Sequence, residues 1–218
     1  MKPFPLVLSA PSGGGKTTIA KALLAAREDL GYSVSATTRP PRPGEEDGRD
    51  YFFLTRQQFE QKIAAGEFVE WAEYGGELYG TLRSQLSAVL GSGRHCVLDI
   101  EINGARAVRA MYPDAVLVFV VPPSAEELFE RLGGTKGTRA TSLAQRLRRA
   151  VEELSEALEY DYVVVNAERT EALADVAAIL DAEMRRTRRN PDLKQELDKL
   201  SRDIASLADR LADTEVKA

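Results

Sequence analysis

The chain has 218 residues, of which 44% are hydrophobic and 29% are charged, and its formal net charge at pH 7 is −5. This length can bury one substantial core, and the acidic balance argues against a general role on nucleic acids or membrane surfaces, which select basic faces. The sequence shows neither an apolar run of the ~18 residues that a membrane span needs nor a signal-type start, so we expect a cytoplasmic protein.

The first predicted elements are a strand over residues 6–9 and a helix that begins at Lys16, joined by a glycine-rich turn. The turn fits the phosphate-loop pattern GxxxxGK[ST], except that Ala10 stands at the first glycine position. In such a loop, backbone N–H groups turn toward an anion, Lys16 reaches the outer phosphates and the Thr17 hydroxyl can hold Mg²⁺. The sequence therefore predicts a nucleoside triphosphate site formed by Ala10, Pro11, Ser12, Gly13, Gly14, Gly15, Lys16, Thr17 and Thr18.

Further apolar runs predict strands over residues 96–100, 115–121 and 162–165, with helical patterns over residues 104–111 and 124–132. Because these runs are apolar throughout rather than alternating, both faces of each strand should be covered, as in a parallel sheet between helices. The predicted fold class is α/β. The only cysteine and the only histidine, Cys96 and His95, start one of these strands, where we expect structural roles.

Two segments interrupt this alternation of strands and helices. Residues 35–81 are polar, aromatic and rich in turn formers, which predicts an inserted lobe. Residues 133–142 have no apolar periodicity and lie between two helical stretches, which predicts a lid. Both should border the phosphate loop, because ligands of such folds bind beyond the carboxyl ends of the strands.

In the inserted segment, two of the guanidinium groups lie close in the sequence to several hydroxyl groups and a phenol. Arg39 and Arg42, on an extended and proline-constrained segment, suit bidentate binding of a dianionic phosphate, although a surface ion pair would explain one of them. Glu70 could accept hydrogen bonds from N1–H and the 2-amino group of guanine, a donor pair that adenine lacks, or it could be a solvated residue. The other polar residues of this set are Ser35, Thr37, Thr38, Tyr51, Tyr79 and Thr81.

A carboxylate also ends the predicted strand that starts at Cys96. Asp99 stands where it can hold Mg²⁺, directly or through water, opposite Thr17. An aspartate at the end of a strand is also a common helix cap, so the sequence alone leaves both interpretations open.

Five motifs in this order, SAPSGGGKTT, SVSATTRPPRPGEEDGRDYFF, GEFVEWAEYGGELYGT, VLDIEINGA and EYDYVVVN, resemble the guanylate kinases, and the similarity covers residues 6–182. The resemblance implies phosphorylation of GMP, and of dGMP, by ATP with Mg²⁺. It implies a P-loop kinase with a central parallel five-stranded sheet flanked by helices: a core (residues 1–34, 91–132 and 145–184), a mixed α/β GMP-binding lobe (35–90) and a short lid (133–144). A basic linker and a heptad-patterned helix (185–218) lie outside it.

The same resemblance implies roles for individual residues. Asn166 matches a position near the adenine of ATP, and Glu101 stands where the family usually has an aspartate near the guanine. In the lid, Thr135 replaces an expected arginine, and Lys136 or Arg139 could reach the same phosphates. The implied catalytic residues are Lys16, Arg39, Arg131, Arg139 and Arg146, the metal ligands are Thr17 and Asp99, and the GMP site comprises Ser35, Arg39, Arg42, Tyr51, Glu70, Tyr79, Thr81, Asp99 and Glu101.

Two other functions compete with this one. The first is a kinase for another small molecule, but a substrate without guanine would not need the acceptors Glu70 and Ser35. The second is a non-catalytic interaction module, which would not need Lys16, Thr17 and Asp99. ATP binding would separate the module from the enzyme.

The C-terminal region follows a different pattern. We interpret the arginines at 185, 186, 188 and 189 as a basic helix end rather than an anion site. Beyond them, leucine and isoleucine recur with heptad spacing, which predicts a helix that either folds onto the core or pairs with another subunit. The protein is accordingly expected to be a monomer or a homo-oligomer through Leu193, Leu197, Leu200, Ile204, Leu207 and Leu211.

Overall fold

The computed structural model describes residues 2–133 and 140–215, with side chains left out at 140, 141, 209 and 211–215. The chain divides into two units, residues 3–180 and residues 181–218 together with the first two residues, and each unit is described by itself. Most of the predicted lid, including Lys136 and Arg139, lies outside the described residues.

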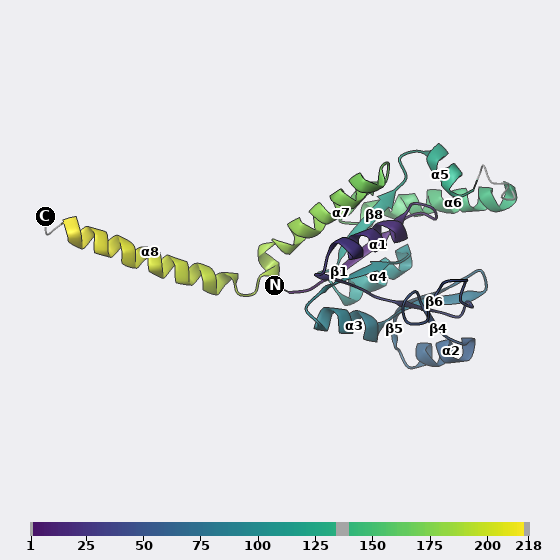
Figure 1. The fold of residues 1–218 in the computed structure, drawn as a ribbon, viewed down its shortest axis with the longest axis horizontal. Coiled ribbons are helices and arrows are strands. Elements are labelled where there is room, and N and C mark those ends of the chain that lie inside the picture. Colours follow the sequence, from purple (N-terminus) through teal and green to yellow (C-terminus); the bar gives the residue numbers. More distant parts are fainter. Residues whose placement is uncertain (1, 134–139, 216–218) are drawn as a thin grey trace. The chain divides into compact units, whose positions relative to one another are not determined.

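A parallel five-stranded sheet forms the centre of the larger unit (Figure 1). Its strand order is β2-β7-β1-β8-β9, and every neighbouring pair is parallel. This confirms the predicted fold class. The strand that the apolar runs did not predict is β2, whose three residues are too few to show a pattern. The strands are β1 (Pro5–Ser9), β2 (Leu30–Tyr32), β7 (His95–Asp99), β8 (Val116–Val121) and β9 (Tyr162–Val165).

Helices cover the sheet, so its central strands are buried from solvent. All five residues of β1 are buried, and Val116 to Val120 of β8 are buried as well. Cys96 is buried, which raises the pKa of its thiol to about 12, and His95 accepts a hydrogen bond from the backbone of Phe4 at 3.3 Å. Both therefore have the expected structural roles. The helices of this unit's core are α1 (Lys16–Ala26), α3 (Arg83–Gly91), α4 (Ile102–Met111), α5 (Ala125–Arg131), α6 (Ala140–Ser155), the 3-10 turn η1 (Glu156–Glu159) and α7 (Arg169–Met184).

The segment that was predicted to be inserted forms a second sheet, with strand order β4-β3-β6-β5. One helix accompanies it, and a capping box formed by Thr55 and Gln58 starts that helix. Phe59 of the helix stacks on Phe68 with ring centroids 4.3 Å apart, so this sheet has its own small core. The elements are β3 (Ser35–Thr37), β4 (Phe52–Phe53), α2 (Arg56–Ala64), β5 (Phe68–Tyr74) and β6 (Glu77–Leu82).

The smaller unit contains the 3-10 turn η2 (Thr187–Arg189) and the helix α8 (Leu193–Glu215). The structure corrects the interpretation of the arginine-rich segment: α7 ends at Met184, so the arginines follow the helix rather than forming its last turn. Arg189 is 3% exposed and its guanidinium pairs with Glu183 at 2.8 Å. Across the described part of the chain, no helix has the length and apolar character needed to span a membrane.

Candidate active site

The phosphate loop connects β1 to α1 and contains two glycines in the left-handed region. Gly13 has φ 84° and Gly15, the N-cap of α1, has φ 99°. A Cβ on Gly14 would lie 2.8 Å from the Cβ of Ala10, so the residue at position 10 has to be small. The first turn of α1 contains no acidic side chain, which leaves this helix N-terminus suited to an anion.

Lys16 and Thr17, the first two residues of α1, face two carboxylates at the carboxyl end of β7: Asp99 is its last residue and Glu101 follows it. Lys16 Nζ lies 2.9 Å from Glu101 Oε1, and the Thr17 hydroxyl donates to Asp99 Oδ2 at 2.6 Å. Tyr32, from the neighbouring strand β2, donates its hydroxyl proton to the other oxygen of Asp99 at 2.5 Å. Asp99, the last residue of β7, therefore bonds a residue of α1 and a residue of β2, and it lies opposite Thr17 as the sequence predicted.

The donor set formed by Thr17 and Asp99 fits a magnesium ion. Both residues offer oxygen atoms, which Mg²⁺ prefers, and Mg²⁺ typically takes only one or two protein ligands beside phosphates and water. The direct contact between the Thr17 hydroxyl and the Asp99 carboxylate shows that one small cation could reach both oxygens.

Two further predicted residues contact the phosphate loop, and a third contacts one of these two. The Asn166 amide donates to the carbonyl oxygen of Gly14 at 2.9 Å, and its backbone oxygen accepts from Arg131 at 2.9 Å. Arg146 donates to the Ser12 hydroxyl at 2.9 Å. The structure thus brings Arg146 and Asn166 to the loop and places Arg131 against Asn166, while Arg139 lies outside the described residues.

The second sheet gathers Arg39 with the two predicted tyrosines. The Arg39 guanidinium lies 5.4 Å from the ring centroid of Tyr51, and the rings of Tyr51 and Tyr79 are 6.2 Å apart. Glu45 binds Arg39 through both carboxylate oxygens, at 2.9 and 3.0 Å, and this hydrogen bonding raises the pKa of Arg39. Glu45 also accepts the backbone N–H of Arg42 at 2.7 Å, whereas the side chain of Arg42 is exposed.

Glu70 is held at the junction of the second sheet and α4. The Thr81 hydroxyl donates to Glu70 at 2.8 Å, and Ser35 stands opposite Thr81 on the next strand. Burial raises the pKa of Glu70, and the charge of Glu101 adds to this effect. A Cβ on Gly104 of α4 would lie 3.0 Å from the Glu70 carboxyl carbon. Glu70 is therefore a half-buried acceptor, oriented by the buried Thr81, and not a solvated surface residue.

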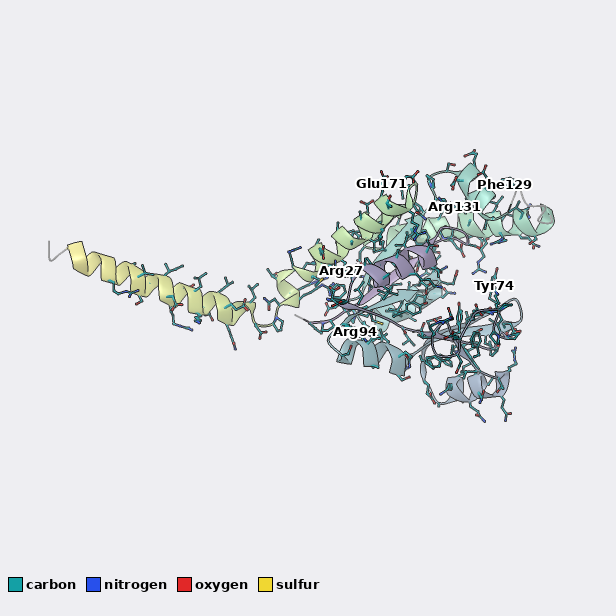
Figure 2. The ribbon with its side chains drawn as sticks, in the orientation of Figure 1. Arg27, Tyr74, Arg94, Phe129, Arg131 and Glu171 are labelled. Atoms are coloured by element: carbon teal, nitrogen blue, oxygen red, sulfur yellow. The ribbon has the colours of Figure 1, made fainter. Side chains whose placement is uncertain are left out.

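Sequence reasoning missed several residues that position this site. Tyr32, Glu45 and Gly104 are described above. Arg149 of α6 lies 3.5 Å from Glu101, bonds Glu153 at 2.8 Å and stands 5.1 Å from the ring centroid of Tyr74, which Figure 2 labels. Tyr32, Gly104 and Arg149 act on residues far apart in the chain, so no local pattern could have found these contacts, whereas Glu45 lies only six residues from Arg39.

Comparisons with known proteins agree with this geometry. Residues 2–183 match the family described as guanylate kinase. The guanylate kinase of Symbiobacterium thermophilum is 49% identical over 185 residues, which cover 85% of this chain and 88% of that protein. The guanylate kinase of Nitrosospira multiformis is 48% identical over 181 residues, which cover 83% and 86%. A crystal structure of guanylate kinase from Anaplasma phagocytophilum superposes with a TM-score of 0.74 at 35% identity, covering 90% of this chain and 94% of that one. The chain belongs to the guanylate kinase family.

Proposed function

We propose that this enzyme transfers the γ-phosphoryl group of ATP directly to a phosphate oxygen of GMP or dGMP, giving ADP and the nucleoside diphosphate. One observation carries the proposal: a phosphate loop with Lys16, Thr17 and Asp99 shares one compact unit with a half-buried Glu70 that accepts from the buried Thr81 and is suited to guanine. A non-catalytic interaction module would not need Lys16, Thr17 and Asp99 at its phosphate loop.

The phosphate loop is the proposed ATP site. The positive end of α1 and Lys16 would hold the phosphates, and Asn166 holds the loop in place through Gly14. Arg146 contacts Ser12 of the loop, and Arg131 contacts Asn166, so both arginines would need little movement to reach a bound phosphate. Thr17 and Asp99 would hold Mg²⁺, which supplies charge neutralisation to the polyphosphate when it is bound.

The second sheet and its surroundings are the proposed GMP site. Glu45 places a carboxylate on the fork of Arg39, where it stands in for an anionic phosphate. Arg39, Arg42, Tyr51 and Tyr79 would hold the GMP phosphate. The base would be read by Ser35, Glu70 and Thr81, with Asp99 and Glu101 at its edge.

The proposed chemistry needs no general base, because the acceptor is already an anionic phosphate oxygen. Lys16, Arg39, Arg131 and Arg146 would neutralise the charge of two converging phosphate chains. In the proposed three-part organisation, the GMP-binding lobe (35–90) and the lid (133–144) close on the core and exclude water. Lys136 or Arg139 would supply the lid's cation.

The proposed partners are nucleotides rather than nucleic acids or membranes, and the proposed location is the cytoplasm. These proposals follow from the acidic net charge of −5 and from a site built for small phosphates.

A coupled assay of ADP release with Mg·ATP tests the proposal by comparing GMP, dGMP, AMP, UMP and no acceptor. The expected result is turnover with GMP and dGMP only. Equal turnover with AMP would contradict the proposed role of Glu70, and no turnover from folded, ATP-binding protein would contradict the enzyme itself.

A further inference from the structure

The helix α8 carries an apolar stripe that its own unit leaves uncovered. Leu197, Leu200, Ile204 and Leu207 alternate in spacing between three and four residues, and their exposed fractions lie between 52% and 58%. A stripe with this spacing is the seam along which helices pack in coiled coils. A short isolated helix is marginal in water, so this stripe calls for a partner that covers it.

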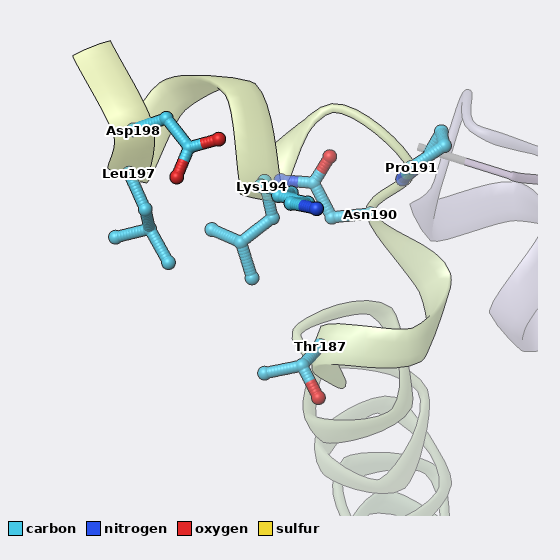
Figure 3. Close-up of a pocket in the computed structure, with 7 residues that line it drawn as sticks. Thr187, Asn190, Pro191, Lys194, Leu197 and Asp198 are labelled. Atoms are coloured by element: carbon cyan, nitrogen blue, oxygen red, sulfur yellow. The ribbon is translucent and has the colours of Figure 1, made fainter.

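A hollow of about 410 Å³ continues the stripe at the start of α8. Leu193 and Leu197 line it from the helix, and Thr187 of η2 lies on the same hollow (Figure 3). Leu197 belongs to both the stripe and the lining of the hollow, so the two adjoin. The name α8 seam is used below for Leu193, Leu197, Leu200, Ile204 and Leu207.

We propose that the α8 seams of two copies of this chain pack against each other as an antiparallel pair. In this arrangement the two kinds of seam position, a and d of the heptad, face each other. Leu197 of one copy then meets Leu207 of the other, and Leu200 meets Ile204. Leu193 meets the leucine that the sequence has at position 211. Every seam residue therefore faces an apolar residue, and Leu207 of the second copy lies at the hollow.

The charges beside the seam favour this orientation. Glu196 and Arg210 lie on the same flank of the seam, one toward each end of the helix. In the antiparallel pair, Glu196 of each copy faces Arg210 of the other, which gives two contacts between opposite charges. A parallel pair would set Glu196 opposite Ser201 and would form neither contact.

One contact opposes the pairing and provides a second test of its register. Asp203 lies midway along the flank that carries Glu196 and Arg210. In the antiparallel pair it faces Asp203 of the second copy, so like charges meet at the centre. A parallel pair would instead set Asp203 opposite Ala208.

Sedimentation equilibrium of the full chain over a range of concentrations tests the proposal. We expect a reversible dimer whose dissociation constant rises about tenfold in Glu196→Arg and in Arg210→Glu, because each change turns two attractive contacts into repulsive ones. The double variant restores both contacts and should return to within about twofold of the original value. Arg202→Glu, which changes the same charge on the outward face of α8, is the matched control and should leave the constant unchanged.

Two further variants test whether the α8 seam forms the dimer contact and whether the two helices are antiparallel. Ile204→Asp should abolish dimerisation, and Asp203→Asn should tighten it about threefold. A chain that stays monomeric at every concentration would overturn the proposal, because the seam would then be covered by the chain's own core or by nothing. A dimer in which Glu196→Arg and Asp203→Asn have no effect would overturn the antiparallel register. Unchanged circular dichroism and kinase turnover would show that each variant is folded.

Discussion

Lys16 of the phosphate loop is paired with Glu101, whose carboxylate oxygen lies 2.9 Å from the lysine nitrogen. The other oxygen of Glu101 lies 3.5 Å from Arg149. A phosphate that takes Lys16 therefore replaces an existing carboxylate partner. The pair is partly exposed, so water and salt weaken it, and the replacement costs only a modest amount of binding free energy.

Removing the charge of Glu101 should end the competition between Glu101 and a bound phosphate for Lys16. In Glu101→Gln, Lys16 has no carboxylate to leave, so we expect the dissociation constant of ATP, measured without GMP by calorimetry, to fall about threefold. Glu152→Gln, which removes a carboxylate from α6 outside this pair, is the control. An unchanged or higher constant in Glu101→Gln would contradict a competing role for the pair.

Glu70 should set the choice of guanine. In Glu70→Gln the acceptor for N1–H and the 2-amino group is replaced by an amide that also carries donors, so we expect KM for GMP to rise about a hundredfold while KM for ATP stays unchanged. Glu73→Gln, an exposed glutamate on the same strand, is the matched control. Equal changes in both Michaelis constants would instead indicate a general loss of structure.

The pH dependence of GMP binding should report the same carboxyl group. Burial raises the pKa of Glu70, so the group takes up its proton at a higher pH than an ordinary glutamate does. As pH falls through that raised pKa, KM for GMP should increase, whereas KM for ATP should not change.

The raised pKa of Glu70 also affects how stability depends on pH. Folding favours the protonated group, so the stability it gives is present at low pH and lost as pH rises through the folded-state pKa.

Thermal unfolding at neutral pH checks that sign. Glu70→Gln removes a partly desolvated charge while keeping an oxygen for the Thr81 hydroxyl, so we expect its melting temperature to equal or exceed that of the unchanged enzyme. A marked fall would show that the ionised carboxylate stabilises the fold.

Gly104 should matter because of what lies beside it. A Cβ at this position would meet the Glu70 carboxyl carbon at 3.0 Å, so Gly104→Ala should displace Glu70 and raise KM for GMP about tenfold. Alanine favours a helix interior by about 1 kcal/mol over glycine, which offsets part of the crowding in stability measurements. Gly91→Ala provides the control, since a Cβ there meets no atom within 4 Å. Equal kinetics for the two variants would contradict the prediction.

Tyr32 should act by positioning Asp99. The hydroxyl bonds Asp99 at 2.5 Å, and burial, followed by the charge of Asp99, raises the pKa of the tyrosine, so it stays a neutral donor. Tyr32→Phe should raise the Mg²⁺ concentration for half-maximal turnover several-fold, because the carboxylate loses its orientation. Tyr112→Phe serves as the control. A loss of kcat that added Mg²⁺ leaves unchanged would point to a different role.

The sequence was informative where a pattern is local. The apolar runs predicted four strands of the main sheet because buried parallel strands are apolar along their whole length, and the spacing from Ala10 to Thr17 predicted the phosphate loop. The three residues of β2 were too few to show a pattern. Tyr32 and Gly104 could not be found because each acts through a residue distant in the chain, namely Asp99 and Glu70.

The arginines after α7 show that composition alone can also suggest the wrong structural role. Four arginines in five positions predicted a basic helix end, yet all four follow the end of α7 and Arg189 is buried on Glu183. Composition indicates charge, but it does not show which charge finds a partner.

The transfer itself is tested most directly by following labelled phosphate from γ-³²P ATP in the presence of GMP and Mg²⁺. The expected product is labelled GDP, formed by the unchanged enzyme and by the control Lys21→Met. In Lys16→Met its rate should fall by at least about a hundredfold, on the scale of one lost preorganised charge. Label released as inorganic phosphate, or labelled GDP formed at an unchanged rate in Lys16→Met, would contradict direct transfer at this phosphate loop.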